Sequence, residues 1–243
     1  MKKRIIAVVA FLALIVAIFG LPPFSGGPSG KYLSDAEISN FQNGVHRQSN
    51  GTYEVSAFTP MPGVDAKMVR WWFADYMQTT EHYQRWYPGA HVWMDWENKV
   101  PGEYVGASHL VHEYIGDELM KLRIQFVPHE EILGDIKLKT DDVAVCARVG
   151  LLEKPVNVAK MCHIIRNNDA GAVMLSRFWM GQVQKRDRNQ TVGSIEGIIG
   201  NTYLARKVAI RQQNAIDLKD HALQEMGILA GFLPELYENE ISE

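Results

Sequence analysis

The chain has 243 residues, 47% of them hydrophobic, and a formal net charge of -3. This length and apolar content suffice for one globular domain with a core large enough to enclose a pocket. The balanced charge and the short basic clusters, at residues 2–4 and 185–188, argue against a nucleic-acid-binding protein, so no nucleic acid is expected as a partner.

The N-terminal segment, residues 1–21, has the sequence MKKRIIAVVAFLALIVAIFGL and is expected to direct the chain to a membrane. Its apolar run is near the lower end of the roughly 17 to 25 residues that span a bilayer, and slightly longer than a signal-peptide core of about 7 to 15. We therefore predict a signal anchor or a signal peptide. Because basic residues stay on the cytoplasmic side, the domain is expected to be membrane-anchored on the extracytoplasmic side, or secreted after cleavage.

Residues 22–30, PPFSGGPSG, contain only Pro, Phe, Ser and Gly and predict a flexible linker, which leaves residues 31–243 for the folded domain. Residues 65–86 begin with an aspartate suited to capping and carry bulky side chains at helical intervals, which predicts one helix. The Pro88-Gly89 pair predicts a sharp turn after it. This turn places His91 just beyond the helix.

From residue 104 to residue 181 the hydrophobic period changes to two, which is typical of strands with one wet face. Cys146 and Cys162 lie in two strand-like segments joined by the turn-like sequence EKPVN. A disulfide and two separate buried thiols are both compatible with this arrangement. The strands of an antiparallel meander are predicted near residues 104–115, 119–127, 142–152, 158–167 and 171–181.

Residues 201–232 are rich in strong helix formers and lack proline, which predicts one long helix. Antiparallel strands followed by such a helix indicate an α+β fold, in which a curved antiparallel sheet grips the long C-terminal helix and leaves a cavity between them.

His221 and Glu225 are four residues apart on this helix, so an imidazole and a carboxylate project from the same face toward one point. The pair would supply half of a metal site. A pair of this spacing also occurs on solvated helix faces, and that alternative stays open from the sequence.

Glu113 lies in the strand-like sequence GASHLVHEYIG, where alternation places it on the same face as Ala107, His109 and Val111. A carboxylate that faces a core is protonated, ion-paired or bound to a metal, because burying a bare charge is costly. The alternative is an exposed edge strand with Glu113 in water. His91, which follows a rigid turn among many aromatic residues, is a further candidate ligand.

The four side chains, His91, Glu113, His221 and Glu225, form a donor set of two nitrogens and two oxygens that suits zinc, with another divalent metal such as manganese or iron as an alternative. His163 shares a strand face with Ala159 and Met161 and therefore points toward apolar surroundings. It is either a core histidine or, inside a cavity, a group that polarises a substrate oxygen.

Four ordered motifs extend this set: Y-x-x-W-x-P-x-x-H at residues 83–91, H-E-Y-x-G at 112–116, S-R-F-W-x-G at 176–181 and H-x-x-x-E-M-G-x-L-x-x-F-L-P at 221–234. Together they resemble the diacetylphloroglucinol hydrolase family over most of the chain after about residue 60. The resemblance implies a START-like helix-grip fold and zinc-dependent hydrolysis of a carbon-carbon bond between an acyl group and a phenolic ring.

By this resemblance, the zinc ligands are His91, Glu113, His221 and Glu225, and Tyr83 and His163 contact the substrate. The catalytic residues are then His91, Glu113, His163 and Tyr83. The chain departs from the family pattern at Met94, where an asparagine is expected, and at Tyr87, where a histidine precedes the proline.

The expected function is therefore zinc-dependent hydrolysis of an acylated phenolic or β-diketone-like compound, with a small aromatic or polyketide-like substrate. Two alternatives keep the same pocket without this reaction: a non-catalytic carrier or sensor of apolar or aromatic ligands, and a polyketide cyclase-like enzyme. The sequence is also compatible with a homodimer.

Overall fold

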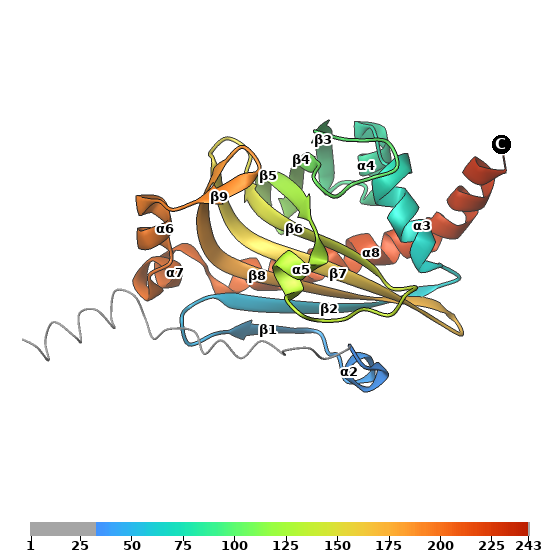
Figure 1. Cartoon of the computed structure of the whole chain (residues 1–243), viewed down its shortest axis with the longest axis horizontal. Helices are drawn as coiled ribbons and strands as arrows, with labels where there is room; N and C mark the ends of the chain where they lie inside the picture. The colour runs from blue at the N-terminus through green and yellow to red at the C-terminus, as the bar shows by residue number, and fades with distance from the viewer. Residues whose placement is uncertain (1–32, 243) are drawn as a thin grey trace, which may run out of the picture.

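A computed structural model describes residues 33–242. These residues form a strongly curved antiparallel sheet of nine strands, and the C-terminal helix α8 lies against it (Figure 1). The strand order is β1-β2-β8-β7-β6-β5-β4-β3, and β9 pairs with β8. The predicted α+β architecture, a curved antiparallel sheet around a long C-terminal helix, is confirmed.

The strands are β1 Gly44–Arg47, β2 Tyr53–Pro62, β3 His91–Glu97, β4 Ser108–Ile115, β5 Glu118–Val127, β6 Val143–Leu151, β7 Val156–Asn168, β8 Gly171–Asp187 and β9 Gln190–Val192. The helices are α2 Asp35–Ser39, α3 Ala66–Trp71, the π-helix η1 Trp72–Tyr76, α4 Thr80–Trp86, α5 His129–Leu133, α6 Ile195–Gly200, α7 Tyr203–Ala209 and α8 Gln212–Ile241.

Helix α8 supplies one wall of the core because its apolar residues recur every three or four positions. Ala222, Met226, Leu229 and Leu233 are all buried by this spacing. His221 and Glu225 lie on the same buried side of the helix, so the solvated-face alternative for this pair is wrong.

The predicted helix over residues 201–232 is divided and extended in the structure. Ile210 is extended, with φ -119° and ψ 113°, and separates α7 from α8. At the other end α8 continues through Pro234 to Ile241. A proline removes one backbone hydrogen bond, but the helix continues because Leu233 and Leu236 are buried on either side of it.

The five predicted strands correspond to β4 through β8, with β4 starting at Ser108 rather than near residue 104. Strand β4 pairs with β3 on one side and β5 on the other, so the edge-strand alternative for Glu113 is wrong. Cys146 and Cys162 face each other in the β6–β7 register and form a disulfide, on the opposite side of these strands from the main core.

The single helix predicted over residues 65–86 is wrong, because the chain forms α3, η1 and α4 instead. Met77 leaves helical geometry with ψ 90°, and the Thr79 side chain then accepts a hydrogen bond from the His82 N–H and starts α4. A threonine at an N-cap competes with helix continuation by satisfying the first free donors of a new helix.

The predicted membrane localisation is corrected by the structure. Over residues 33–242, no helix has both the length and the apolar character needed to cross a bilayer. The 30-residue helix α8 is long enough, but charged side chains recur along it. The segments predicted as signal anchor or signal peptide, residues 1–21, and as linker, residues 22–30, lie outside the described residues.

Candidate metal centre and adjoining cavity

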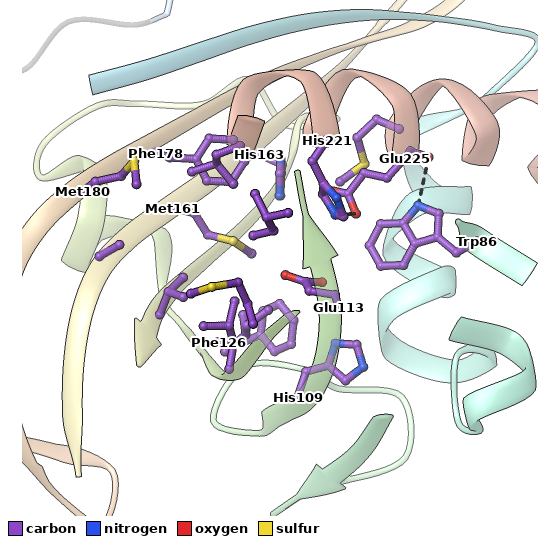
Figure 2. Close-up of a pocket in the computed structure, with 18 of the residues that line it drawn as sticks. Trp86, His109, Glu113, Phe126, Met161, His163, Phe178, Met180, His221 and Glu225 are labelled. Atoms are coloured by element: carbon purple, nitrogen blue, oxygen red, sulfur yellow. Dashed lines mark hydrogen bonds and ion pairs between the residues drawn. The ribbon is translucent and has the colours of Figure 1, made fainter. Parts of the chain in front are cut away.

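Three segments far apart in the sequence bring the candidate ligands together. His91 begins β3, directly after a turn in which Gly89 has φ 86° and the His91 N–H donates to the Tyr87 carbonyl at 3.0 Å. The β3–β4 register sets His91 opposite Glu113. Helix α8 then supplies His221 and Glu225 from above this pair of strands (Figure 2).

The four side chains converge on one buried point. Ligand atoms of His91, Glu113 and His221 all lie within 4.8 Å of one another. The Nε2 atom of His91 is 3.8 Å from an oxygen of Glu113 and 3.4 Å from an oxygen of Glu225. The same oxygen of Glu225 is 3.6 Å from Nε2 of His221. Every sequence-predicted ligand therefore belongs to one cluster.

The imidazoles are oriented as metal ligands require. Nδ1 of His91 lies 2.9 Å from the Tyr83 carbonyl, which can only accept, so Nδ1 carries a proton and Nε2 is the nitrogen that faces the carboxylates. Nε2 of His91 and Nε2 of His221 are both buried, and neither finds a hydrogen-bond partner within the described part of the chain. Two orphaned nitrogens beside two carboxylates fit a divalent cation.

Within the cluster, the histidine and glutamate side chains shift each other's pKa values in opposite directions. Burial lowers the pKa of His221, but the facing carboxylate of Glu225 outweighs this effect and raises the pKa to about 9. Burial raises the pKa of Glu225, but His221 and His91 outweigh it and lower the pKa to about 2. A cation that binds His221 therefore displaces a proton from it.

Tyr83 and Trp86, both on α4, hold the cluster from one side. The Tyr83 hydroxyl donates a hydrogen bond to Glu113, and its ring stacks on His91 with centroids 3.7 Å apart. Burial, and then the charge of Glu113, raise the pKa of Tyr83 well above its usual value, so the hydroxyl keeps its proton. The Trp86 indole donates to the Glu225 carbonyl at 3.0 Å and fixes α8 against α4.

An apolar cavity of about 140 Å³ adjoins the cluster, with Glu113, His221 and Glu225 in its wall. This volume is similar to the roughly 150 Å³ that accommodates one benzene ring. Aromatic and methionine side chains dominate the view in Figure 2, among them Phe126, Met161 and Phe178.

His163, the predicted pocket histidine, lines this cavity. Its Nδ1 lies 2.7 Å from the Ser176 hydroxyl, which fixes the ring and leaves Nε2 for another partner. Burial lowers the pKa of His163 to about 4, so the imidazole is neutral near pH 7. Tyr83 lines the same cavity, whereas Met94, although buried, is not part of its lining.

Three further residues of the site, His109, Ser176 and Trp86, were not assigned a role from the sequence. His109 also lines the cavity, stacks on Trp96 with centroids 4.8 Å apart, and has a buried Nε2 that meets no hydrogen-bond partner in residues 33–242. Burial lowers its pKa to about 3. The strand alternation that selected Glu113 already placed His109 on the same face. The contact of Trp86 crosses from α4 to α8, and that of Ser176 crosses between the paired strands β7 and β8, so the pattern within one element indicates neither.

Fold and site together define an α+β protein whose curved sheet encloses an apolar cavity beside a buried cluster of two histidines and two glutamates. The chain belongs to the family whose model is described as the DAPG hydrolase PhiG domain, which matches residues 30–238. The family resemblance carried by the four sequence motifs is thereby confirmed.

Two curated relatives are similar to most of the chain. A 2,4-diacetylphloroglucinol hydrolase from Pseudomonas sp is 28% identical over 197 residues, which cover 72% of this chain and 64% of the relative. A phloretin hydrolase from Eubacterium ramulus is 27% identical over 225 residues, which cover 85% of this chain and 74% of the relative. The chain thus spans just under two thirds of the first relative.

Among solved structures, the di-domain ARO/CYC StfQ from the steffimycin biosynthetic pathway is similar at a TM-score of 0.42 and 14% identity, over 77% of this chain and 51% of the other.

Proposed function

We propose that this chain is a metal-dependent hydrolase, with zinc as the metal, that cleaves the carbon-carbon bond between an acyl group and a phenolic ring. The observation that carries the proposal is the pair of orphaned imidazole nitrogens, on His91 and His221, facing two buried carboxylates in the wall of an apolar cavity. An apolar carrier site gains nothing from such a cluster. The names of the two curated relatives support a phenolic substrate.

His91, Glu113, His221 and Glu225 would hold the ion, in the donor set that zinc accepts. A divalent cation bound there supplies Lewis acidity for a substrate carbonyl and makes water a nucleophile near neutral pH. The mostly apolar wall of the cavity would exclude other water from the reacting atoms and bind the ring by contact.

In the proposed reaction, water oxygen adds to the carbonyl carbon and the bond from that carbon to the ring breaks. The electron pair of that bond passes to the ring carbon. The ring can accept this pair because the neighbouring phenol is in its keto form. The ring carbon then takes a proton, so the products are a carboxylic acid and the deacylated phenol. Glu113, which accepts a hydrogen bond from Tyr83, would carry that proton. Neutral His163 would hold a phenolic oxygen through Nε2.

The test measures metal content and turnover in the purified full chain. Elemental mass spectrometry after mild dialysis should find about one divalent ion per chain in the wild type and in His46→Ala, a control at an exposed histidine. His221→Ala should lose the ion. With an acylated phloroglucinol, the wild type should release acid and deacylated ring, as mass spectrometry of the products will show.

Two results would overturn the proposal. A fully metal-loaded chain that binds acylphenols tightly without turnover would be a carrier. A product of unchanged mass would indicate a cyclase-like reaction.

A further inference from the structure

A pocket at the surface, distinct from the apolar cavity, has the candidate ligand His221 in its wall. It has a volume of about 540 Å³ and is called the outer pocket here. Residues 87–90 before β3, residues 114–117 around the β4–β5 turn and helix α8 form its walls. Pro88, Asp117 and Gln224 in these walls are exposed, so the outer pocket faces solvent. His221, whose Nε2 faces Glu225, therefore stands between solvent and the metal cluster.

The ring of Tyr87 covers both imidazoles of the cluster. Its centroid lies 5.0 Å from that of His221 and 5.7 Å from that of His91. Both histidines are buried, whereas Tyr87 is partly exposed and lines the outer pocket. The tyrosine ring thus lies over the imidazoles on the side of the outer pocket.

One side-chain contact holds this ring against α8. The Tyr87 hydroxyl donates a hydrogen bond to the side-chain oxygen of Gln224, which is exposed and lies three residues after His221. The backbone of Tyr87 is held separately, because its carbonyl accepts a hydrogen bond from the His91 N–H at 3.0 Å. When the contact with Gln224 breaks, the ring can therefore swing outward while the backbone keeps its hold on His91.

The outer pocket suits a hydrated cation better than the apolar cavity does. The cavity wall is mostly apolar, so a charged ion that crossed it would lose its water at high cost. The outer pocket instead carries the carboxylates of Asp117, Asp217 and Asp220, which attract cations. Lys219 pairs with Asp220 at 2.9 Å and offsets one of these three charges. The remaining negative charge would draw a cation toward the cluster.

We propose that the outer pocket is the route by which a divalent cation enters and leaves the metal cluster, and that the hydrogen bond between Tyr87 and Gln224 is the gate of this route. The inference rests on the metal-dependent part of the proposed function. A gate changes the barrier that the ion crosses and leaves the bound and free states as they are. Its loss therefore speeds entry and release by the same factor.

The test measures zinc exchange by the purified full chain in the absence of substrate. Stopped-flow mixing of the metal-free chain with Zn²⁺ gives the association rate constant, and transfer of bound Zn²⁺ to excess chelator gives the dissociation rate constant. Tyr87→Phe and Gln224→Leu each remove the hydrogen bond and keep the bulk of the side chain. Both rate constants should rise by about 3- to 10-fold, as expected for the loss of one hydrogen bond, and the Kd should stay within about twofold.

Tyr114→Phe is the matched control, because it removes a tyrosine hydroxyl from the wall of the same pocket and leaves the contact between Tyr87 and Gln224 in place. Its exchange rates should equal those of the wild type. The two gate variants lie on different elements, so either one tests the gate if the other does not fold, and circular dichroism verifies the fold of each.

Exchange at the wild-type rates in both gate variants would overturn the inference, because the ion would then take another path. A faster release alone, with weaker binding at equilibrium, would also overturn it, since Tyr87 would then position the histidines and not gate the ion. A wild type that takes up no zinc would overturn both this inference and the metal in the proposed function. Zinc exchange as expected, without hydrolysis of an acylphenol, would count against the proposed reaction alone.

Discussion

Tyr83 joins the candidate metal cluster to the adjoining apolar cavity, because its hydroxyl holds Glu113, its ring packs on His91 and it lines the cavity. Tyr83→Phe keeps the ring and removes the donor, so Glu113 loses its orientation. Partners of this kind are worth about 10- to 100-fold in metal affinity or activity, and a fall of that size is expected in one of the two. Metal titration and steady-state kinetics measure it.

Tyr104→Phe is the control for this change, since Tyr104 is also buried but donates to the Ala144 carbonyl, away from the cluster. An equal loss of activity in both variants would show that Tyr83 acts only through stability.

His163 makes stability depend on pH. Burial holds its pKa at about 4 in the folded chain, against about 6.5 when unfolded, so the unfolded state binds more protons between these values. The contribution of neutral His163 to the free energy of unfolding is therefore fully present above about pH 6.5 and is lost as pH falls toward 4. At pH 5 the free energy of unfolding should be about 2 kcal/mol lower than at pH 7 through His163 alone.

His163→Gln should remove that part of the pH dependence, as urea denaturation at pH 7 and pH 5 will show, whereas the exposed-site variant His46→Gln should keep it. An unchanged slope in His163→Gln would contradict the assigned burial. His109, with a pKa of about 3, adds a similar dependence that remains in this variant.

At the scale of elements, the disulfide ties β6 to β7 over a sequence separation of 16 residues. Closing a loop of this length stabilises a fold by about 3 kcal/mol through the unfolded state. The double variant with Cys146→Ala and Cys162→Ala should therefore unfold at lower urea concentration, by up to about that free energy. A reductant should destabilise the wild type similarly and leave the double variant unchanged; stability unaltered by both treatments would rule out the bond.

The sequence predicts elements where one physical pattern dominates. Period-two alternation located β4 to β8, and the spacing of His221 and Glu225 predicted their shared face, because both patterns arise within one element. The break between η1 and α4 was missed because bulky residues continue at helical spacing across it, and neither the extended Met77 nor the Thr79 cap changes that spacing. Strand β2 was missed although its residues alternate between more and less buried, since it contains Pro60 and Pro62.

The pairing of elements was less accessible to sequence reasoning. The convergence of β3, β4 and α8 on one point depends on sheet register and helix docking, which no single segment encodes. For the same reason the contact of Ser176 with His163, across β7 and β8, appeared only in the structure.

At the scale of the whole molecule, the cluster links the sheet to α8, so a bound metal should stabilise the entire fold. A ligand at about 100 times its dissociation constant adds about 2.7 kcal/mol, which for a chain of this size raises the melting temperature by roughly 5 to 10 °C. Calorimetry with added zinc and with a chelator should show the shift in the wild type. The same shift in His221→Ala would place the ion elsewhere.

The hydrogen bond from Trp86 to the Glu225 carbonyl joins residues that are 139 positions apart in sequence. Contacts of such separation form only after the intervening chain has lost most of its freedom, and they slow folding. We therefore expect ion capture to be among the last events of refolding, after the sheet has formed and α8 has docked. In zinc fingers, where the ligands are close in sequence, the ion instead drives folding from the start. Here, uptake of the ion would serve as a kinetic marker that the native chain topology is complete.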